Sequence, residues 1–279
     1  MSPRPLIRRA APRSAHPVRR SAAARTSGRV DPQRARAILE GLHREHPQAR
    51  CALDHRGAFE LLVATILSAQ CTDKRVNLVT PDLFRRCPTP AALAAAPRQE
   101  IENLIRTTGF FRSKARSLHE MSRALAQRFG GEVPRSLEEL TALQGVGRKT
   151  ANVVLGTAYG IASGVVVDTH VSRVARRLGL TRHSDPVRIE RDLMAIVPRH
   201  EWVDFSHRVI WHGRLVCKAQ RPRCEVCSLA PHCPAGKMEL ARRARELRGA
   251  PERPGGRSRT KRRRPASRRS GAAGARRPS

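Results

Sequence analysis

The segment Leu143-Gln-Gly-Val-Gly-Arg-Lys-Thr-Ala151 separates two stretches with helical patterning, Ser136 to Leu143 and Asn152 to Ala158. The predicted order is therefore helix, tight glycine turn, helix. Gly145 and Gly147 permit a positive φ and carry no side chain, so the backbone can approach a ligand closely. The N–H groups that open the second helix point outward beside the positive end of its dipole, which is a phosphate-binding geometry.

Lys149 stands in the first turn of that second helix, where the helix dipole disfavours a cation. The same placement favours the neutral amine, which is the form that a lysine nucleophile needs. The alternative is a plain helix–helix turn with a solvated Arg-Lys pair. The strongly basic context favours DNA binding by the hairpin over that alternative.

Asp168 follows nineteen residues later, in the segment Val165-Val-Val-Asp-Thr-His170. It ends a short apolar run and precedes a helix, so one interpretation is a simple N-cap. The other is a carboxylate that the cap holds rigidly toward Lys149. The two interpretations are compatible, and the residues alone do not choose between them.

Charge is the main compositional signal, with 55 Lys and Arg against 23 Asp and Glu and a formal net charge of +32. Such a surplus predicts a polyanionic partner, because phosphate contacts that release counterions supply most of the affinity. No apolar run approaches the roughly 20 residues that a membrane helix needs.

Both ends of the chain are basic and poor in aromatic residues. Residues 1–30 and 240–279 cannot bury enough apolar surface to offset their ordering entropy, so we expect disordered tails that bind DNA weakly. The Arg- and Ser-rich N-terminus also has the composition of an organelle transit peptide. Because the C-terminal tail shares the bias, we expect instead a bacterial cytoplasmic protein associated with the nucleoid.

Four of the seven cysteines, Cys217, Cys224, Cys227 and Cys233, lie within seventeen residues. Four thiolates at this spacing can ligate zinc or an iron–sulfur cluster. One Cys-x2-Cys pair flanked by two single ligands departs from the paired knuckles of structural zinc sites and favours [4Fe–4S]. The loop from Cys217 to Cys224 carries three basic residues, which ligation would fix as a finger for DNA phosphate: Lys218, Arg221 and Arg223.

Helical periodicity dominates the rest of the chain, with apolar faces over about 33–45, 59–70, 75–86, 90–96, 98–107, 112–129 and 136–142. Asp185 and Pro186 are typical of an N-cap and a first helical position. Only Val165 to Val167 is strand-like, and it is too short to found a sheet. The predicted fold class is all-α.

Taken together, these segments resemble endonuclease III of the helix-hairpin-helix DNA glycosylase superfamily. The resemblance rests on Gly-Val-Gly-Arg-Lys-Thr-Ala, then Val-Asp-Thr-His, then Cys-x6-Cys-x2-Cys-x5-Cys, in that order. Leu67 to Asp73 and Gly109 to Ala115 resemble two further family segments, so the match spans about residues 31–235.

The resemblance implies two helical domains flanking a DNA cleft. One is a six-helix domain over 51–161 that contains the hairpin. The other is an iron–sulfur cluster domain built from 31–50 plus 162–239, with a [4Fe–4S] cluster on the four cysteines. No other small-molecule cofactor is expected, and we expect a monomer.

The resemblance also implies the chemistry, which is removal of oxidised pyrimidines from duplex DNA and cleavage 3′ to the abasic site. Lys149 would attack the sugar C1′, and Asp168 would stabilise the developing charge. Gln70 matches the residue that fills the gap left by a flipped nucleotide, and Phe110 matches an apolar wedge. The further DNA-binding residues that we predict are Gly145, Val146, Gly147, Arg148, His170, Lys218, Arg221 and Arg223.

Two alternatives remain beside this bifunctional glycosylase and AP lyase. One is a monofunctional glycosylase that releases bases without nicking the strand. The other is a non-enzymatic, redox-sensing iron–sulfur protein, which would need neither Lys149 nor Asp168. Adenine glycosylases resemble the chain but usually lack a lysine at position 149. Gln144, a position that is usually Pro in the family, should loosen the turn slightly.

Overall fold

The structure, a computed structural model, describes residues 30–249, so most of both expected tails lies outside the described residues. Within them the chain is helical and has no strand, which confirms the all-α prediction. The helices are α1 (Pro32–Glu45), α2 (Ala58–Leu67), α3 (Asp73–Arg86), α4 (Pro90–Ala95), α5 (Arg98–Leu104), α6 (Phe111–Arg128), α7 (Leu137–Thr141), α8 (Arg148–Tyr159), α9 (Thr169–Arg177), α10 (Pro186–Met194), α11 (Trp202–Leu215) and α12 (Pro234–Leu247), with short 3-10 turns η1 (Arg106–Thr108), η2 (Arg199–Glu201), η3 (Cys224–Val226) and η4 (Ala230–His232).

Local chemistry explains where most of these helices begin. The carboxylate of Asp185 accepts the Arg188 N–H at 2.9 Å, and Pro186 opens α10, as predicted. Asp31, Thr72, Thr89 and Ser136 cap α1, α3, α4 and α7 in the same way. Each cap satisfies an N–H group that has no partner inside its own helix.

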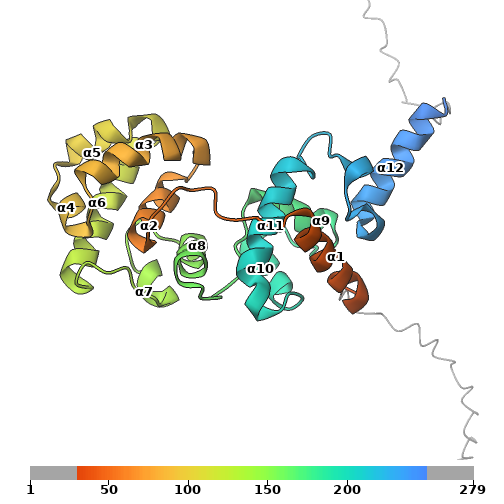
Figure 1. The fold of residues 1–279 in the computed structure, drawn as a ribbon, viewed down its shortest axis with the longest axis horizontal. Helices are drawn as coiled ribbons and strands as arrows, with labels where there is room; N and C mark the ends of the chain where they lie inside the picture. The colour runs from red at the N-terminus through yellow and green to blue at the C-terminus, as the bar shows by residue number, and fades with distance from the viewer. Residues whose placement is uncertain (1–29, 250–279) are drawn as a thin grey trace, which may run out of the picture.

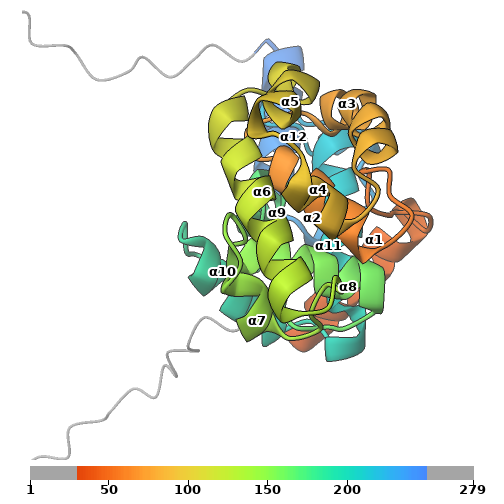
Figure 2. The same ribbon diagram turned by 90° about the vertical axis from the view of Figure 1, so that its left-hand side faces the viewer.

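The described helices form two lobes, each with its own hydrophobic core (Figure 1). The first core lies among α2 to α8, around side chains such as Leu62, Leu118 and Met121. The second joins α1 to α9, α10 and α11, around Ile38, Val174 and Phe205, so the first described helix packs in the lobe formed by the later ones. The domain division expected from the sequence, with its break near residue 161, stays a prediction. Figure 2 shows the first lobe in front of the second.

Two expectations need correction or refinement. The tail predicted to begin at residue 240 is instead helical as far as Leu247. Within this helix, Arg242 and Arg243 both donate hydrogen bonds to the carboxylate of Glu239. These i,i+3 and i,i+4 pairs stabilise a helix that composition alone did not reveal. The apolar run 165–167 is buried but forms no strand; Val165 and Val167 pack in the second core, and the Val166 N–H bonds Ser206 Oγ.

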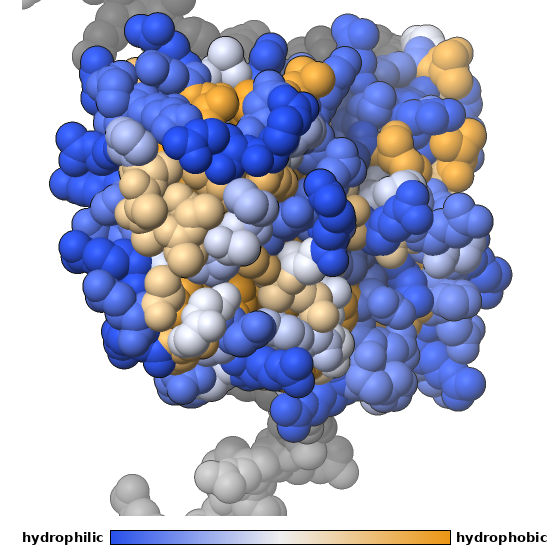
Figure 3. Space-filling model, turned by 60° about the vertical axis from the view of Figure 1, so that its left-hand side comes forward, coloured by the Kyte–Doolittle hydropathy of each residue, from blue (hydrophilic) through white to orange (hydrophobic). Residues whose placement is uncertain are grey.

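The surface agrees with the composition. On the face of Figure 3, hydrophilic side chains cover most of the protein; a weakly apolar area lies in its left half, and separate strongly apolar groups stand near the top. None of the helices between residues 30 and 249 combines the length and the apolar character that a bilayer crossing demands.

Helix α8 joins the two lobes, and a buried carboxylate from α10 holds it. Arg148 donates two hydrogen bonds to Glu190, at 2.8 and 3.3 Å, and Asn152 Nδ2 donates a third at 2.9 Å. The Glu190 side chain is only 8% exposed, so its charge depends on these donors. One turn farther along the same face of α8, Gly156 lets Val203 of α11 approach closely, because a Cβ there would lie 2.9 Å from a Val203 methyl carbon.

We predict that Glu190→Gln lowers the free energy of unfolding by about 1–3 kcal/mol, because a charge-assisted fork becomes a neutral contact in a buried site. Urea unfolding of the intact protein measures this change. The matched control is Glu40→Gln, which removes an exposed i,i+4 pair with Arg36 and should cost no more than about 0.5 kcal/mol. Equal effects in the two variants would contradict a structural role for the Glu190 carboxylate.

Candidate active site and cysteine centre

The glycine hairpin has the predicted form, since α7 ends at Thr141 and α8 begins at Arg148. Gly145 adopts a φ of 80°, and a Cβ at this position would lie 2.7 Å from the Ser117 Cβ on α6. Both the left-handed backbone and the close approach therefore require glycine. Val146 turns its side chain into the first core, and its N–H donates to the Leu143 carbonyl. Neither its side chain nor its N–H is therefore available to DNA, and the predicted DNA contact of Val146 has no support in this geometry.

Gly147 differs from the expectation of a positive φ. Its φ is −90° and its ψ 171°, which is extended backbone that any residue adopts. No atom lies within 4 Å of the position of its missing Cβ. Gly147 is the N-cap of α8 and offers no side-chain cap, so the first amides of α8 face open space. Glycine here leaves room for an approaching ligand rather than for a neighbouring helix.

Lys149 is exposed in the first turn of α8. Its ammonium has no hydrogen-bond or ion-pair partner within residues 30–249. Arg148 differs, because its guanidinium is already held by Glu190. The two adjacent basic residues therefore have different environments: Arg148 joins the lobes, and Lys149 is available for an external group.

Asp168 is the N-cap of α9, as one interpretation of the sequence had it. Its Oδ1 accepts the Val171 N–H at 2.7 Å. No ion pair joins it to Lys149 in the described part of the chain, so a catalytic pairing of the two stays a prediction. In the first turn of the same helix, His170 Nδ1 lies 3.1 Å from Arg173 Nη2. Burial lowers the pKa of the His170 imidazole.

Glu190 and Asn152 hold the helix that carries Lys149 against the loop that leads to Asp168. Sequence reasoning missed both residues. Ser163 Oγ, in the loop before Asp168, donates to Asn152 Oδ1 at 2.9 Å. A Cβ on Gly164 would overlap both Glu190 Oε1 and Asn152 Nδ2, so the loop passes directly over the buried carboxylate. No local sequence signal indicated this carboxylate, because its partner Arg148 lies 42 residues away in the chain.

Gln70 and Phe110 are exposed, and both adopt left-handed backbone, with φ values of 53° and 48°. The Phe110 side chain is 68% exposed, which excludes an ordinary core aromatic at this position. Gln70 lies beyond the end of α2, which stops at Leu67 and not at residue 70. An exposed aromatic ring and an exposed amide at loop tips suit contact with another molecule better than packing.

The four clustered cysteines surround one cavity of about 260 Å³, and none of them forms a disulfide. N–H groups face three of the sulfurs. Arg177 Nη1 donates to Cys217 Sγ at 3.4 Å, Gly236 N donates to Cys233 Sγ at 3.2 Å, and His212 Nε2 lies 3.7 Å from Cys227 Sγ. Burial raises the pKa of the Cys227 thiol to about 12, so its thiolate needs a bound cation. Convergent sulfurs with N–H donors around them fit an iron–sulfur cluster.

The basic loop between Cys217 and Cys224 is held through its backbone, and its charged side chains are exposed. Arg177 donates to the carbonyls of Lys218 and Ala219 at 2.6 and 2.8 Å. Arg243 donates to the Pro222 carbonyl at 2.9 Å. Lys218, Arg221 and Arg223 therefore extend from a fixed loop, and Arg221 has a left-handed φ of 50°. Their contact with DNA stays a prediction.

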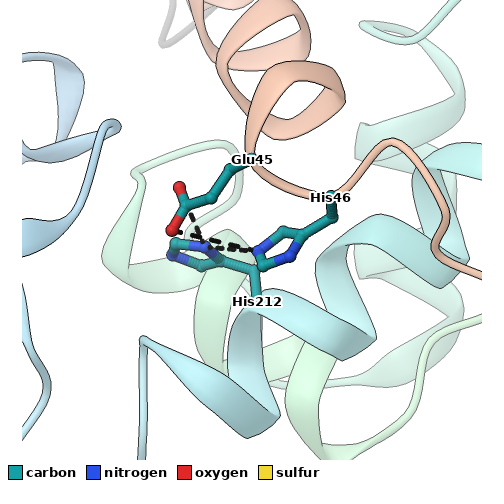
Figure 4. Close-up of side chains that lie close together, drawn as sticks. All are labelled: Glu45, His46 and His212. Atoms are coloured by element: carbon teal, nitrogen blue, oxygen red, sulfur yellow. Dashed lines mark hydrogen bonds and ion pairs between the residues drawn. The ribbon is translucent and has the colours of Figure 1, made fainter.

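A buried group of three side chains adjoins the cysteine cavity (Figure 4). His46 Nε2 lies 3.3 Å from His212 Nδ1, and the Glu45 carboxylate lies 3.6 Å from the same nitrogen. Burial lowers the pKa of His212 to about 4, so its ring is neutral at pH 7. With His46 as the donor to Nδ1, the single proton of a neutral His212 would lie on Nε2, toward Cys227. His212 thus has a structural role beside the cysteine cavity.

Comparisons with known proteins agree with this arrangement. The family model for HhH-GPD superfamily base excision DNA repair proteins matches residues 63–199. The endonuclease III of Synechocystis is 56% identical over 205 residues, covering 74% of this chain and 94% of the relative. That of Escherichia coli K12 is 40% identical over 196 residues, covering 70% and 92%. A solved structure of a trapped endonuclease III–DNA covalent intermediate superposes with a TM-score of 0.72 at 45% identity, covering 76% of this chain and 99% of its own.

We predict different outcomes for the two hairpin glycines. Gly145→Ala should lower stability by about 1–3 kcal/mol, because the methyl group meets Ser117 and the φ is positive. Gly147→Ala should leave Tm unchanged but weaken binding of a DNA duplex about tenfold, the equivalent of one charge-assisted hydrogen bond. Thermal unfolding and fluorescence anisotropy measure the two effects. Undiminished affinity in Gly147→Ala would argue against phosphate binding at the start of α8.

Proposed function

The chain belongs to the endonuclease III family, within the HhH-GPD superfamily of base excision DNA repair proteins, and on this premise we propose how its residues carry out the reaction. It is a DNA glycosylase that also acts as an AP lyase. We propose that Lys149 is the nucleophile, that Asp168 is its carboxylate partner and that oxidised pyrimidines in duplex DNA are the substrates. Because one chain supplies every proposed site residue, we propose a monomer.

One observation carries the assignment of Lys149. It is an exposed lysine in the first turn of a helix whose amides lack a side-chain cap, beside a glycine that leaves the surface open. The amides and the helix dipole suit a phosphate of the DNA backbone. A phosphate bound there would bring the adjoining sugar close to the lysine amine. Arg148 is already engaged by Glu190, which leaves Lys149 as the available amine.

The chemistry follows from that position. The lone pair of the neutral amine attacks C1′ of the damaged nucleotide, the glycosidic bond breaks, and the departing base takes up a proton. The amine gives its own proton to Asp168, whose orientation the α9 cap fixes. Opening of the sugar ring yields a Schiff base. Its positive charge acidifies the C2′ proton, and loss of that proton expels the 3′ phosphate by β-elimination.

Gln70 and Phe110 account for access to the base. An enzyme that acts on a base must extrude it from the stack, at a cost of a few kcal/mol that is smallest for damaged bases. We propose that the exposed Phe110 ring wedges into the duplex and that Gln70 fills the vacated space. The covalent complex solved for a 45% identical relative supports the same duplex substrate class.

We propose that the four cysteines hold a [4Fe–4S] cluster, which supplies structural cross-linking of the loop and no step of the reaction. The shared cavity gives room for a cluster and the N–H donors suit bound thiolates, while the ligand spacing favours the cluster over zinc. Ligation at Cys217 and Cys224 would close the basic loop at both ends. Lys218, Arg221 and Arg223 would then meet DNA phosphate at fixed positions. Because the relatives are bacterial enzymes, we place the protein in the bacterial cytoplasm, at the nucleoid.

Borohydride reduction on duplex DNA with an oxidised pyrimidine tests the mechanism. The wild-type protein should give a covalent adduct and a nicked strand. Lys149→Ala should give no adduct, because no amine remains to form the Schiff base, and Asp168→Asn should slow adduct formation about 100-fold or more. Lys237→Ala, which removes an exposed lysine of α12, is the control and should trap normally.

Two outcomes would contradict the proposal. Base release without nicking or trapping would make the protein a monofunctional glycosylase. Tight binding with no base release from any lesion would make it a non-enzymatic iron–sulfur protein.

For the cysteine centre we predict about four iron and four sulfide per chain of the purified protein, as expected for one [4Fe–4S] cluster. Cys224→Ala should lose most of the iron and weaken duplex binding, because the basic loop is no longer closed. Cys51→Ala, a half-buried cysteine of the first lobe, should keep both. Metal analysis that finds one zinc per chain would overturn the cluster assignment.

A further inference from the structure

Three non-glycine residues between positions 30 and 249 have a left-handed backbone: Gln70, Phe110 and Arg221. This conformation costs an L-residue roughly 1–2 kcal/mol and persists only where the surroundings enforce it. Two of the three are the residues that we propose to enter the duplex. Some contact in the first lobe must therefore hold both strained tips.

Lys114, in the first turn of α6, provides that contact. Its ammonium donates to the Leu67 carbonyl at 2.8 Å and to the Thr108 carbonyl at 2.8 Å. Leu67 is the last residue of α2, three positions before Gln70, and Thr108 ends η1, two positions before Phe110. One side chain thus links the bases of both loops, which lie about forty residues apart in sequence.

The same residue is also bonded to the Phe110 loop through its main chain, because the Lys114 N–H donates to the Phe110 carbonyl at 3.0 Å. Phe110 itself is the N-cap of α6 and lacks a capping side chain. The position of the aromatic tip therefore depends on Lys114 from two directions.

Burial of the Lys114 ammonium destabilises the folded protein. It is 6% exposed, and no carboxylate of the described chain pairs with it. Burial lowers the pKa of its ammonium. A buried cation with only carbonyl partners is costly, even though the C-terminal carbonyl of α2 lies at the negative end of a helix dipole. An apolar side chain of similar volume would fill the same space at lower cost. The two hydrogen bonds are what such a side chain could not supply.

We propose that Lys114 is a positioning residue that holds the Gln70 and Phe110 tips at a fixed separation, so that wedge and filler engage the duplex together as the base leaves the stack. This proposal rests on the proposed function, since it needs a base-extruding enzyme. Lys114 touches neither DNA nor the reacting atoms and acts through the two loops. It should therefore affect base extrusion and not the steps that follow it.

The test compares two substrates under single-turnover conditions. On a duplex with an oxidised pyrimidine, Lys114→Met should slow base excision about 10- to 100-fold, the range expected for a misplacement of about 1 Å. On a duplex with a preformed abasic site, where no base must leave the stack, borohydride trapping should fall less than about threefold. The fluorescence rise of 2-aminopurine placed next to the lesion reports extrusion directly and should slow together with excision. Lys237→Met is the charge-matched control and should change neither.

The outcomes separate this proposal from the one on which it rests. Absence of trapping in the wild-type protein would overturn the proposed function itself. Equal losses on the two substrates, or normal 2-aminopurine kinetics in Lys114→Met, would overturn the role of Lys114 while leaving the function intact. If Lys114→Met does not fold, Lys114→Gln, which keeps N–H donors on a shorter side chain, takes its place.

Combining Lys114→Met with substitutions at the two tips gives a second check. Because Lys114 acts through the tips, adding Lys114→Met to a variant with both Gln70→Ala and Phe110→Ala should slow excision little further. Fully additive losses would show that Lys114 acts elsewhere.

Discussion

The geometry of the site depends on the hydrogen bonds that the buried Glu190 carboxylate accepts. A charge in an interior position is tolerated only when donors surround it, and here the donors come from Arg148 and Asn152. Both lie on α8, the helix of Lys149, while the loop toward Asp168 crosses the same carboxylate at Gly164. One electrostatic requirement thus fixes three segments relative to one another: the helix that carries Lys149, the loop that ends at Asp168 and the lobe behind them.

The site combines rigid and strained parts in a consistent way. Lys149 and Asp168 are placed by regular elements, a helix start and an N-cap, where the backbone is relaxed. Gln70 and Phe110 are placed by left-handed residues at exposed tips, where the backbone is strained. The division matches the two tasks that we propose for these residues. Chemistry needs a reproducible distance to the sugar, whereas insertion into a duplex needs side chains that protrude from the surface.

Local signals in the sequence were enough for much of this picture. The hairpin, the caps at Asp168 and Asp185 and most helix positions depend on neighbours within four residues, so periodicity and cap chemistry predicted them. Long-range polar contacts were beyond such signals. Nothing near Lys114 or Glu190 indicated that their side chains are buried, because their partners lie on other elements. Gly147 was misjudged because glycine supplies either positive φ or open space, and only the fold shows which.

Helix α9 joins two features that are usually considered separately. Its first turn is capped by Asp168, while Arg173 and Arg177, farther along, donate to backbone carbonyls of the cysteine loop from Cys217 to Ala219. Nine residues of helix thus connect the carboxylate to the cysteine centre. When homologues are recombined into chimeras, the segment from Asp168 to Cys233 should come from one parent, because its residues contact one another. A chimera joined inside it would combine a helix from one parent with a loop shaped for another, whereas junctions at Gly160 or beyond α12 would leave the segment whole.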